Sequence, residues 1–327
     1  MTSLLEKLVV KGHVIRNRIV LPPMATELAS ERGEVTNALL RHYKLRARGT
    51  GIVIVEHTFI SEEGRRSKNQ LGIYSDELIS GLKRLARTIK EEGATAIIQL
   101  NHAGAKAPSE IIGRRPVGPS SVQVPGSEEI PKELSREEIE EIIEKFVNAA
   151  RRAMEAGFDG VEIHGAHGFL LSEFLSSLTN KRTDEYGGSL ENRMRLHLRT
   201  VDMVRRQVDD LLFFRLGVTD YMEGGLTLEE GVKVAMTLEK HGVDVIDVSG
   251  GLCGSRPPWT AEEGYFLNLS EAVKNKVSVP VIGVGGIKSP VFADKALKEG
   301  KADLIAVGRV FLADPDWALK AIEVLSV

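Results

Sequence analysis

Cysteine is scarce in this chain, and neither sign of charge is in large excess. Cys253 is the only cysteine among 327 residues. This excludes an internal disulfide framework, a zinc site built from several cysteines and a cysteine-ligated iron–sulfur cluster. The formal net charge is −3, so no broad attraction to nucleic acid or to an anionic membrane is expected. We expect a small-molecule substrate as the partner.

Long apolar stretches are also missing. Residues 1–20 lack the apolar segment of a signal peptide, and no uncharged stretch approaches the roughly 18 residues of a membrane span. No linker rich in Ser, Gly or Pro divides the chain, although its length alone suggests about two domains. We therefore expect a cytoplasmic protein with a single domain over residues 1–327.

Short apolar runs alternate with helix-patterned segments along the whole chain. Four to six β-rich residues flanked by Gly or Pro are typical of strands buried on both faces. The expected strands are residues 18–22, 52–56, 95–100, 159–164, 211–216, 243–248, 279–284 and 303–307. Eight strands, each followed by a helix, predict an α/β fold of the (β/α)8 TIM-barrel type. An N-terminal β-hairpin at residues 8–15 is expected to plug the bottom of the barrel.

Three amphipathic segments carry clear helix signals, at residues 135–156, 227–241 and 290–299. The first opens with Ser135 and Glu138 in the spacing of a capping box, and the last has proline in its first turn. Between the elements, the longest irregular stretches follow the third and sixth expected strands. In a TIM barrel the loops after the strands build the active site, so these two are candidate substrate walls.

The ends of the last two strands carry a phosphate-binding pattern. Gly285 and Gly286 follow the seventh strand, and Gly308 and Arg309 follow the eighth. Glycines let backbone N–H groups approach an anion, and the guanidinium of Arg309 suits a phosphate. An alternative to a phosphate site is that these glycines are required only for tight turns between the strands and the helices.

Two histidines, His164 and His167, stand at the end of the fourth expected strand. Residues three apart face opposite sides of a regular strand, but a turn at the strand end lets both rings converge. Two imidazoles can then donate hydrogen bonds to a carbonyl oxygen that becomes more negative during a reaction. The alternatives are a His-x-x-His metal site, for which no third ligand of obvious spacing is present, and two core histidines.

A string of specific polar residues follows the histidine pair, and generic helix or core requirements do not explain it. Its members are Asn180, Arg182, Asp184, Glu185, Tyr186, Gly187, Gly188, Glu191, Asn192 and Arg193. With these residues, segment 162–193 closely resembles the signature of the old yellow enzyme family, the FMN-dependent ene-reductases and their relatives. The string is expected to be structural, with positive φ at Gly187 and Gly188 and an acidic partner for Arg193.

The resemblance spans residues 8–317 and implies FMN as cofactor, NADH or NADPH as reductant, and a substrate oxygen bound by His164 and His167. It also implies cofactor contacts at the flavin edge, at the pyrimidine end, near N1 and O2, and at the phosphate. The residues implied at the flavin edge are Pro22, Pro23, Met24, Ala25 and His57, and the residue implied at the pyrimidine end is Gln99. Arg215 is implied near N1 and O2, and the residues implied at the phosphate are Gly285, Gly286, Gly308 and Arg309.

The chain departs from the family pattern in three ways. Many relatives have a tyrosine in place of Phe169 that protonates the α-carbon. Phenylalanine cannot do so, which leaves water, Tyr221, Tyr265 or no donor. Ala25 replaces a Cys or Thr that contacts flavin O4 in other branches. The cysteine cluster of the multidomain relatives is missing, so electrons are expected to reach FMN directly from NADH or NADPH.

The leading hypothesis is an FMN-dependent oxidoreductase in which NAD(P)H reduces FMN and hydride passes to the β-carbon of an α,β-unsaturated carbonyl. One alternative keeps the flavin and changes the reaction to that of an NAD(P)H oxidase or a dehydrogenase of amines or other substrates. Others are a flavin-free aldolase or isomerase that uses only the phosphate site, and a non-catalytic FMN-binding subunit. Family analogy favours a homo-oligomer, a dimer or a tetramer.

Overall fold

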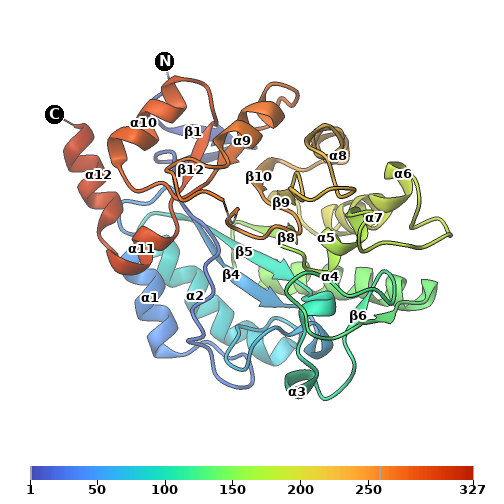
Figure 1. Cartoon of the computed structure of the whole chain (residues 1–327). Helices are drawn as coiled ribbons and strands as arrows, with labels where there is room; N and C mark the ends of the chain where they lie inside the picture. Colours follow the sequence, from blue (N-terminus) through green and yellow to red (C-terminus); the bar gives the residue numbers. More distant parts are fainter. Residues whose placement is uncertain (1, 258, 327) are drawn as a thin grey trace.

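A closed barrel of parallel strands forms the centre of the molecule (Figure 1). The computed structural model describes residues 2–257 and 259–326. In order around the barrel the strands are β3 (Ile19–Leu21), β4 (Ile52–Phe59), β5 (Thr95–Asn101), β8 (Gly160–Gly165), β9 (Leu211–Gly217), β10 (Val245–Ser249), β11 (Val281–Gly283) and β12 (Leu304–Ala306). β12 pairs with β3 and closes the sheet, so the predicted TIM barrel and its eight strands are confirmed.

The strand ends differ from prediction most at β4, which runs three residues beyond the expected end at Glu56. Its register with β5 shifts between Val55 and Thr58, which is the signature of a bulge. The bulge keeps β4 paired out to Phe59. A bulge leaves no simple mark in an apolar run, because it arises from the pairing with the neighbouring strand.

The predicted hairpin consists of β1 (Leu8–Val10) and β2 (His13–Ile15), paired antiparallel. Val10 and Ile15 are buried in one apolar cluster with residues from the barrel strands. That cluster contains Ile52, the first residue of β4, and Leu211, the first residue of β9. The hairpin therefore covers the amino ends of the strands, as expected.

The barrel interior changes from apolar to polar along the strands. Ile97, Phe213 and Val245 belong to the lower apolar cluster. Two residues further along the same strands stand Gln99, Arg215 and Asp247, all buried. Because side chains alternate along a strand, these polar groups occupy the next inward positions, closer to the carboxyl ends. The fold thus builds a polar layer beneath the rim where active sites of TIM barrels lie.

Helices surround the barrel and bury one face each against it (Figure 1). The longer ones are α1 (Asn37–Ala47), α2 (Ile79–Glu91), α4 (Arg136–Glu155), α7 (Arg195–Arg205), α8 (Leu228–Lys240), α9 (Leu267–Lys274), α10 (Pro290–Lys298) and α12 (Trp317–Leu325). The shorter ones are α3 (Ser109–Ile112), α5 (Leu170–Leu175), α6 (Leu190–Arg193) and α11 (Arg309–Ala313). Within the described residues, none of these helices has the length and apolar character needed to cross a membrane.

The predicted helix signals have the expected geometry. Ser135 accepts from the backbone N–H of Glu138, whose carboxylate accepts from the backbone of Ser135, which completes the capping box of α4. Thr227 and Glu230 form a second box at α8, and Pro290 occupies the first turn of α10. Each box satisfies backbone donors that the first helical turn leaves without partners.

The polar string after the histidine pair makes structural contacts. Gly188 has φ +82°, as expected, and Arg193 pairs with Glu230 at 2.6 Å. The expectation of positive φ at Gly187 is wrong. A Cβ there would lie 2.2 Å from the carbonyl oxygen of Arg182, so close backbone packing explains the glycine.

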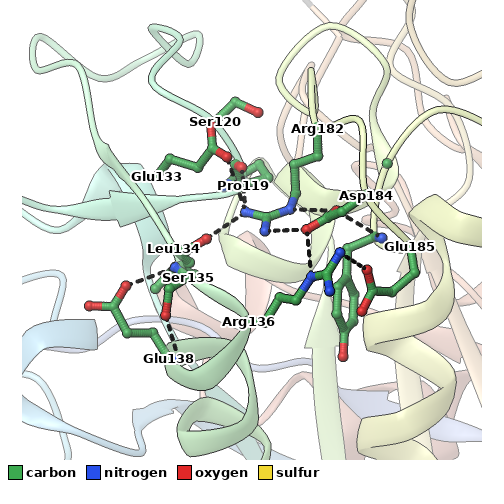
Figure 2. A network of polar contacts seen from close by, with 12 residues as sticks. Pro119, Ser120, Glu133, Leu134, Ser135, Arg136, Glu138, Arg182, Asp184 and Glu185 are labelled. Atoms are coloured by element: carbon green, nitrogen blue, oxygen red, sulfur yellow. Dashed lines mark hydrogen bonds and ion pairs between the residues drawn. The ribbon is translucent and has the colours of Figure 1, made fainter.

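Arg182 ties this string to the loop between β5 and α4, which contains the short strands β6 (Val117–Gly118) and β7 (Lys132–Glu133) (Figure 2). Its guanidinium donates to the carbonyl oxygens of Pro119 (3.1 Å) and Leu134 (2.6 Å) and forms two bonds to the Asp184 carboxylate (3.0 and 2.6 Å). The Arg182 side chain is 4% exposed. One buried cation therefore fixes a loop that forms a candidate substrate wall.

We predict that Arg182→Met lowers the free energy of unfolding by about 3 kcal/mol, because Asp184 and two backbone carbonyls lose their donor. The matched control is Arg136→Met. Arg136 also approaches Asp184 (3.6 Å) and pairs with Glu185 (2.8 Å), but it is 60% exposed (Figure 2). Its loss is expected to cost at most about 1 kcal/mol. Urea denaturation of the two variants measures the difference, and equal losses would contradict the structural role of Arg182.

Candidate active site

A pocket of about 460 Å³ lies at the carboxyl ends of the barrel strands. It is lined by Pro22, Met24, Arg215, Ser255, Arg256, Ala261, Tyr265, Val284, Gly286, Ile287, Lys288, Gly308, Arg309 and Val310. Six residues expected to contact the cofactor are among them: Pro22, Met24, Arg215, Gly286, Gly308 and Arg309. The structure thus brings together residues of the first, fifth, seventh and eighth barrel strands, which are far apart in the sequence.

Steric constraints explain why glycine occupies three positions at this pocket. Gly285 has φ +142°, and a Cβ on it would lie 2.7 Å from the backbone nitrogen of Phe266. Gly286 has φ +65°, and its Cβ would lie 2.8 Å from the ring of Tyr265. A Cβ on Gly308 would lie 2.9 Å from the sulfur of Met24. The tight-turn explanation therefore holds for these residues, and it coexists with their position at the pocket.

The pocket lining is strongly cationic. It contains Arg215, Arg256, Lys288 and Arg309, and no carboxylate is among its lining residues within the described chain. Arg309, the first residue of α11, donates to the Tyr265 hydroxyl (3.2 Å), which in turn donates to the carbonyl oxygen of Ser255 (2.9 Å). Such a lining suits an anionic group such as a phosphate.

The two histidines of the signature converge, as the turn at the strand end predicts. β8 ends at Gly165, and His167 adopts φ +60°. The ring centroids of His164 and His167 are 5.1 Å apart at an interplanar angle of 87°. His167 Nε2 lies 2.7 Å from Ser249 Oγ at the end of β10, and Nδ1 of His164 has no partner among the described residues. This nitrogen of His164 is therefore free to interact with a ligand.

Burial sets the charge state of these histidines. It lowers the pKa of both His164 and His167 well below the usual value, and the nearby cations Arg215 and Lys106 lower each pKa further. Burial also lowers the pKa of His57 to about 4. All three rings are therefore neutral at pH 7.

His57 joins this cluster through its ring. It stacks on Phe169 with centroids 5.5 Å apart, and Phe169 meets the ring of His164 edge-on at 5.1 Å. Nδ1 of His57 lies 2.9 Å from Nε2 of Gln70 and 3.3 Å from Nδ2 of Asn101. Because both neighbours are amide donors, Nδ1 accepts and the ring proton resides on Nε2. The side chain of His57 is therefore held in place by two amides.

Gln99 lies in the polar layer beneath the rim and outside the pocket lining. Its Nε2 donates to Oε1 of Glu162 (2.8 Å), and Nε of Arg215 lies 3.3 Å from Oδ2 of Asp247. Burial, reinforced by Asp247, raises the pKa of Glu162, whereas Arg215 opposes the rise that burial causes at Asp247. Burial therefore favours the protonated form of Glu162, and Asp247 lies where it can balance part of the charge of Arg215.

The remaining predicted positions lie along the same rim. Pro23 is half-buried and Ala25 is exposed, and neither lines the pocket. Of the alternative proton donors, Tyr265 lies in the pocket, where Arg309 and Ser255 engage its hydroxyl. Tyr221 stacks on Phe266 at 6.2 Å. Phe169 is therefore surrounded by nitrogen-bearing side chains and not by phenols.

Sequence reasoning missed several charged residues of the rim. Glu162 and Asp247 interrupt otherwise apolar strands, and a carboxylate in a buried strand is a signal that could have identified them. Lys106 had no such signal. It lies in the long loop after β5, yet its Nζ donates to the carbonyl oxygen of His167 at 2.7 Å. The described residues contain no group of three or more metal-binding side chains.

Comparison with known proteins agrees with this geometry. Residues 3–326 match the family described as "NADH:flavin oxidoreductase / NADH oxidase family". The chain is 45% identical to "NADH oxidase" of Thermoanaerobacter brockii over 95% of its length, but spans only 49% of that protein. It is 42% identical to "NADPH dehydrogenase" of Geobacillus sp. (strain WCH70), with 98% of this chain and 94% of the relative covered.

The solved structure of an old yellow enzyme homologue from Zymomonas mobilis superposes with a TM-score of 0.87 at 27% identity, covering 99% of this chain and 93% of that one. The resemblance inferred from segment 162–193 is therefore confirmed. By these matches the chain belongs to the NADH:flavin oxidoreductase / NADH oxidase family, which includes the old yellow enzymes.

Proposed function

We propose that the protein is an NAD(P)H-dependent ene-reductase built on a single TIM-barrel domain, with His164 and His167 as the substrate-binding pair. As a member of its family it is an FMN-dependent oxidoreductase. Bound FMN would supply the hydride chemistry that links NADH or NADPH to the β-carbon of an α,β-unsaturated carbonyl compound. The observation that carries the proposal is the convergence of two neutral imidazoles above a buried cation.

The residues at the rim fit FMN. Arg309, Gly286 and Gly308 line one pocket with three further cations, which suits a phosphate. Arg215 lines the same pocket, and its register partner across the β8–β9 ladder is His164. The pocket and the histidine pair are thus neighbours across the β8–β9 strand pair. A ligand with a phosphate at one end and a reactive ring at the other requires such an arrangement.

The histidine pair would bind and polarise the substrate carbonyl. A neutral imidazole still carries one N–H donor, and two such donors aimed at one oxygen stabilise the negative charge that develops there. In other oxyanion sites each donor contributes about 3 kcal/mol to this stabilisation. Ser249, 2.7 Å from His167, would fix the orientation of that ring.

Arg215 would supply the fixed positive charge beneath this site. Its guanidinium is buried, and Asp247 lies close enough to orient it. Among the described residues, Asp247 is the only carboxylate within ion-pair distance of this guanidinium. The remaining positive charge favours electron density at the pocket floor, which supports acceptance of hydride there.

Further features of the protein follow from the family by analogy. We infer a cytoplasmic homo-oligomer, a dimer or a tetramer, that acts on small molecules and uses NADPH or NADH. The name of the Thermoanaerobacter brockii relative favours a second candidate, transfer of electrons from NADH to oxygen.

A visible spectrum recorded without oxygen tests the proposal. The holoenzyme is expected to bleach on addition of NADPH and to recover its flavin absorbance when cyclohexenone follows. Bleaching without recovery until oxygen enters would favour the oxidase. A colourless protein that binds no added FMN would contradict both.

We predict that His164→Ala/His167→Ala lowers the rate of enone reduction by about 10³-fold or more while FMN stays bound, because both oxyanion donors are lost. The matched control is His241→Ala, whose ring pairs with Asp202 at the end of α8. Stopped-flow measurement of each half-reaction provides the readout. Retained enone turnover in the double variant would refute the assignment of the pair.

We also predict that the two rings stay neutral as the pH is lowered from 8 to 6. Because burial lowers their pKa in the folded state, only the unfolded chain takes up these protons just below its own value of about 6.5. Each ring therefore costs the fold up to about 1.4 kcal/mol per pH unit below that value. Imidazole ¹⁵N chemical shifts report the charge directly. An imidazolium signal from either ring at pH 7 would contradict this prediction.

A further inference from the structure

Lys106 is a cation beside the histidine pair that has no ion-pair partner among the described residues. It ends the short 3₁₀ turn Gly104–Lys106 after β5, and its side chain is half-buried. Nζ donates to the carbonyl oxygen of His167 at 2.7 Å, and among the described residues it forms no ion pair. The nearest acid is Glu173, whose pKa burial raises and which lies beyond ion-pair distance of the Lys106 ammonium. An ammonium group removed from water without a counter-ion is costly, and such a group usually serves a ligand.

The chain makes room for this ammonium. Gly168 has φ +66°, and a Cβ there would lie 2.8 Å from Nζ of Lys106. On the other side, Ala105 donates its backbone N–H to Glu173 at 2.8 Å and so holds the turn that carries the lysine. Since His167 O takes one of the three N–H groups, up to two remain for other acceptors.

Lys106 lies close to the ring of Phe169 and therefore close to the expected reaction site. Nζ lies 5.9 Å from the centroid of this ring, which also contacts His57 and His164. Phe169 occupies the position where a phenol would donate a proton, and it has none to give. The lysine therefore carries N–H donors next to the place that lacks an O–H donor.

We propose that Lys106 is the proton donor to the α-carbon in the reduction of the activated alkene. The inference rests on the proposed function. When hydride arrives at the β-carbon, the π electrons of the C=C bond move toward the carbonyl oxygen held by the histidines. An N–H bond of Lys106 then breaks, its electron pair stays on nitrogen, and a C–H bond forms at the α-carbon. The carbonyl re-forms, and the neutral amine regains a proton from water.

The environment of Lys106 suits this role. Burial lowers its pKa, which makes the ammonium a stronger acid than a lysine in water. The neighbouring histidines are neutral and compete neither for the proton nor for the charge. General acids positioned in this way accelerate proton transfer by about 10²- to 10⁴-fold.

The test compares Lys106→Met, Lys106→Arg, Phe169→Tyr and the double variant Lys106→Met/Phe169→Tyr, all as FMN holoenzymes. Reduction by NADPH is measured first in every variant, and a flavin that still bleaches verifies folding and cofactor binding. Oxidation by cyclohexenone is expected to slow by about 10²-fold or more in Lys106→Met. Phe169→Tyr should restore at least a tenth of the wild-type rate to Lys106→Met, since it supplies a phenol at the same place.

Lys106→Arg separates charge from proton transfer, because guanidinium keeps the charge but is too weak an acid to donate. A rate like that of Lys106→Met supports the proposal, and a wild-type rate overturns it in favour of electrostatic assistance alone. A wild-type rate in Lys106→Met overturns it as well. The proposed function would fail differently, because wild-type enzyme bleached by NADPH would not recover with cyclohexenone.

A nitroalkene provides a second readout that a purely structural role would not move. Hydride transfer to 1-nitrocyclohexene gives a nitronate, a stable anion that absorbs in the near ultraviolet. Lys106→Met is expected to accumulate the nitronate, whereas wild-type enzyme yields the nitroalkane. The same product from both would overturn the assignment of Lys106 as the donor.

Discussion

Closure of the parallel sheet between β12 and β3 is the constraint on which the candidate site depends. Ile305 pairs with Ile19 and Ala306 with Val20, and this short contact turns an open sheet into a barrel. Because every strand of the barrel then runs the same way, every carboxyl end meets at one rim. The hydrogen-bond register between neighbouring strands then fixes the relative positions of the side chains at this rim. It places His164 opposite Arg215 and Arg215 opposite Asp247, so the substrate-binding ring, the cation and its carboxylate have little freedom relative to one another.

Closure also removes ionisable groups from water, and their neighbours decide which of them keep a charge. Burial and the neighbouring Asp247 raise the pKa of Glu162 well above its usual value, whereas the guanidinium beside Asp247 limits the rise that burial causes there to a pKa of about 6. The histidines have cations nearby and no carboxylate partner, so they become neutral donors. Positive charge therefore persists at Arg215 and Lys106. A rim of this kind binds anionic ligands and stabilises negative charge that forms during a reaction.

Much of this arrangement could be predicted from local sequence. The apolar runs predicted all eight barrel strands, a capping box predicted the start of α4, and the strand end at His164 predicted the convergence with His167. Contacts across the fold could not be predicted in this way. The bond from Lys106 to His167 joins residues 61 positions apart and depends on a loop path that periodicity does not describe. The bulge in β4 likewise depends on its partner strand, and the packing of Gly187 on Arg182 depends on a turn made by the whole segment.

The neighbours of Phe169 offer a physical explanation for phenylalanine at a position where many relatives have tyrosine. A phenol at this position would hydrogen-bond with the surrounding nitrogens, whereas the phenyl ring contacts His57, His164 and Lys106 without taking a hydrogen bond from any of them. An apolar ring beside these three groups lowers the local polarity, which strengthens their electrostatic effect on a bound ligand. The donors of His164 and Lys106 thus remain available to the substrate. Phenylalanine at residue 169 and lysine at residue 106 are therefore best understood as one arrangement, in which an apolar ring separates the donors and an ammonium replaces the missing acid.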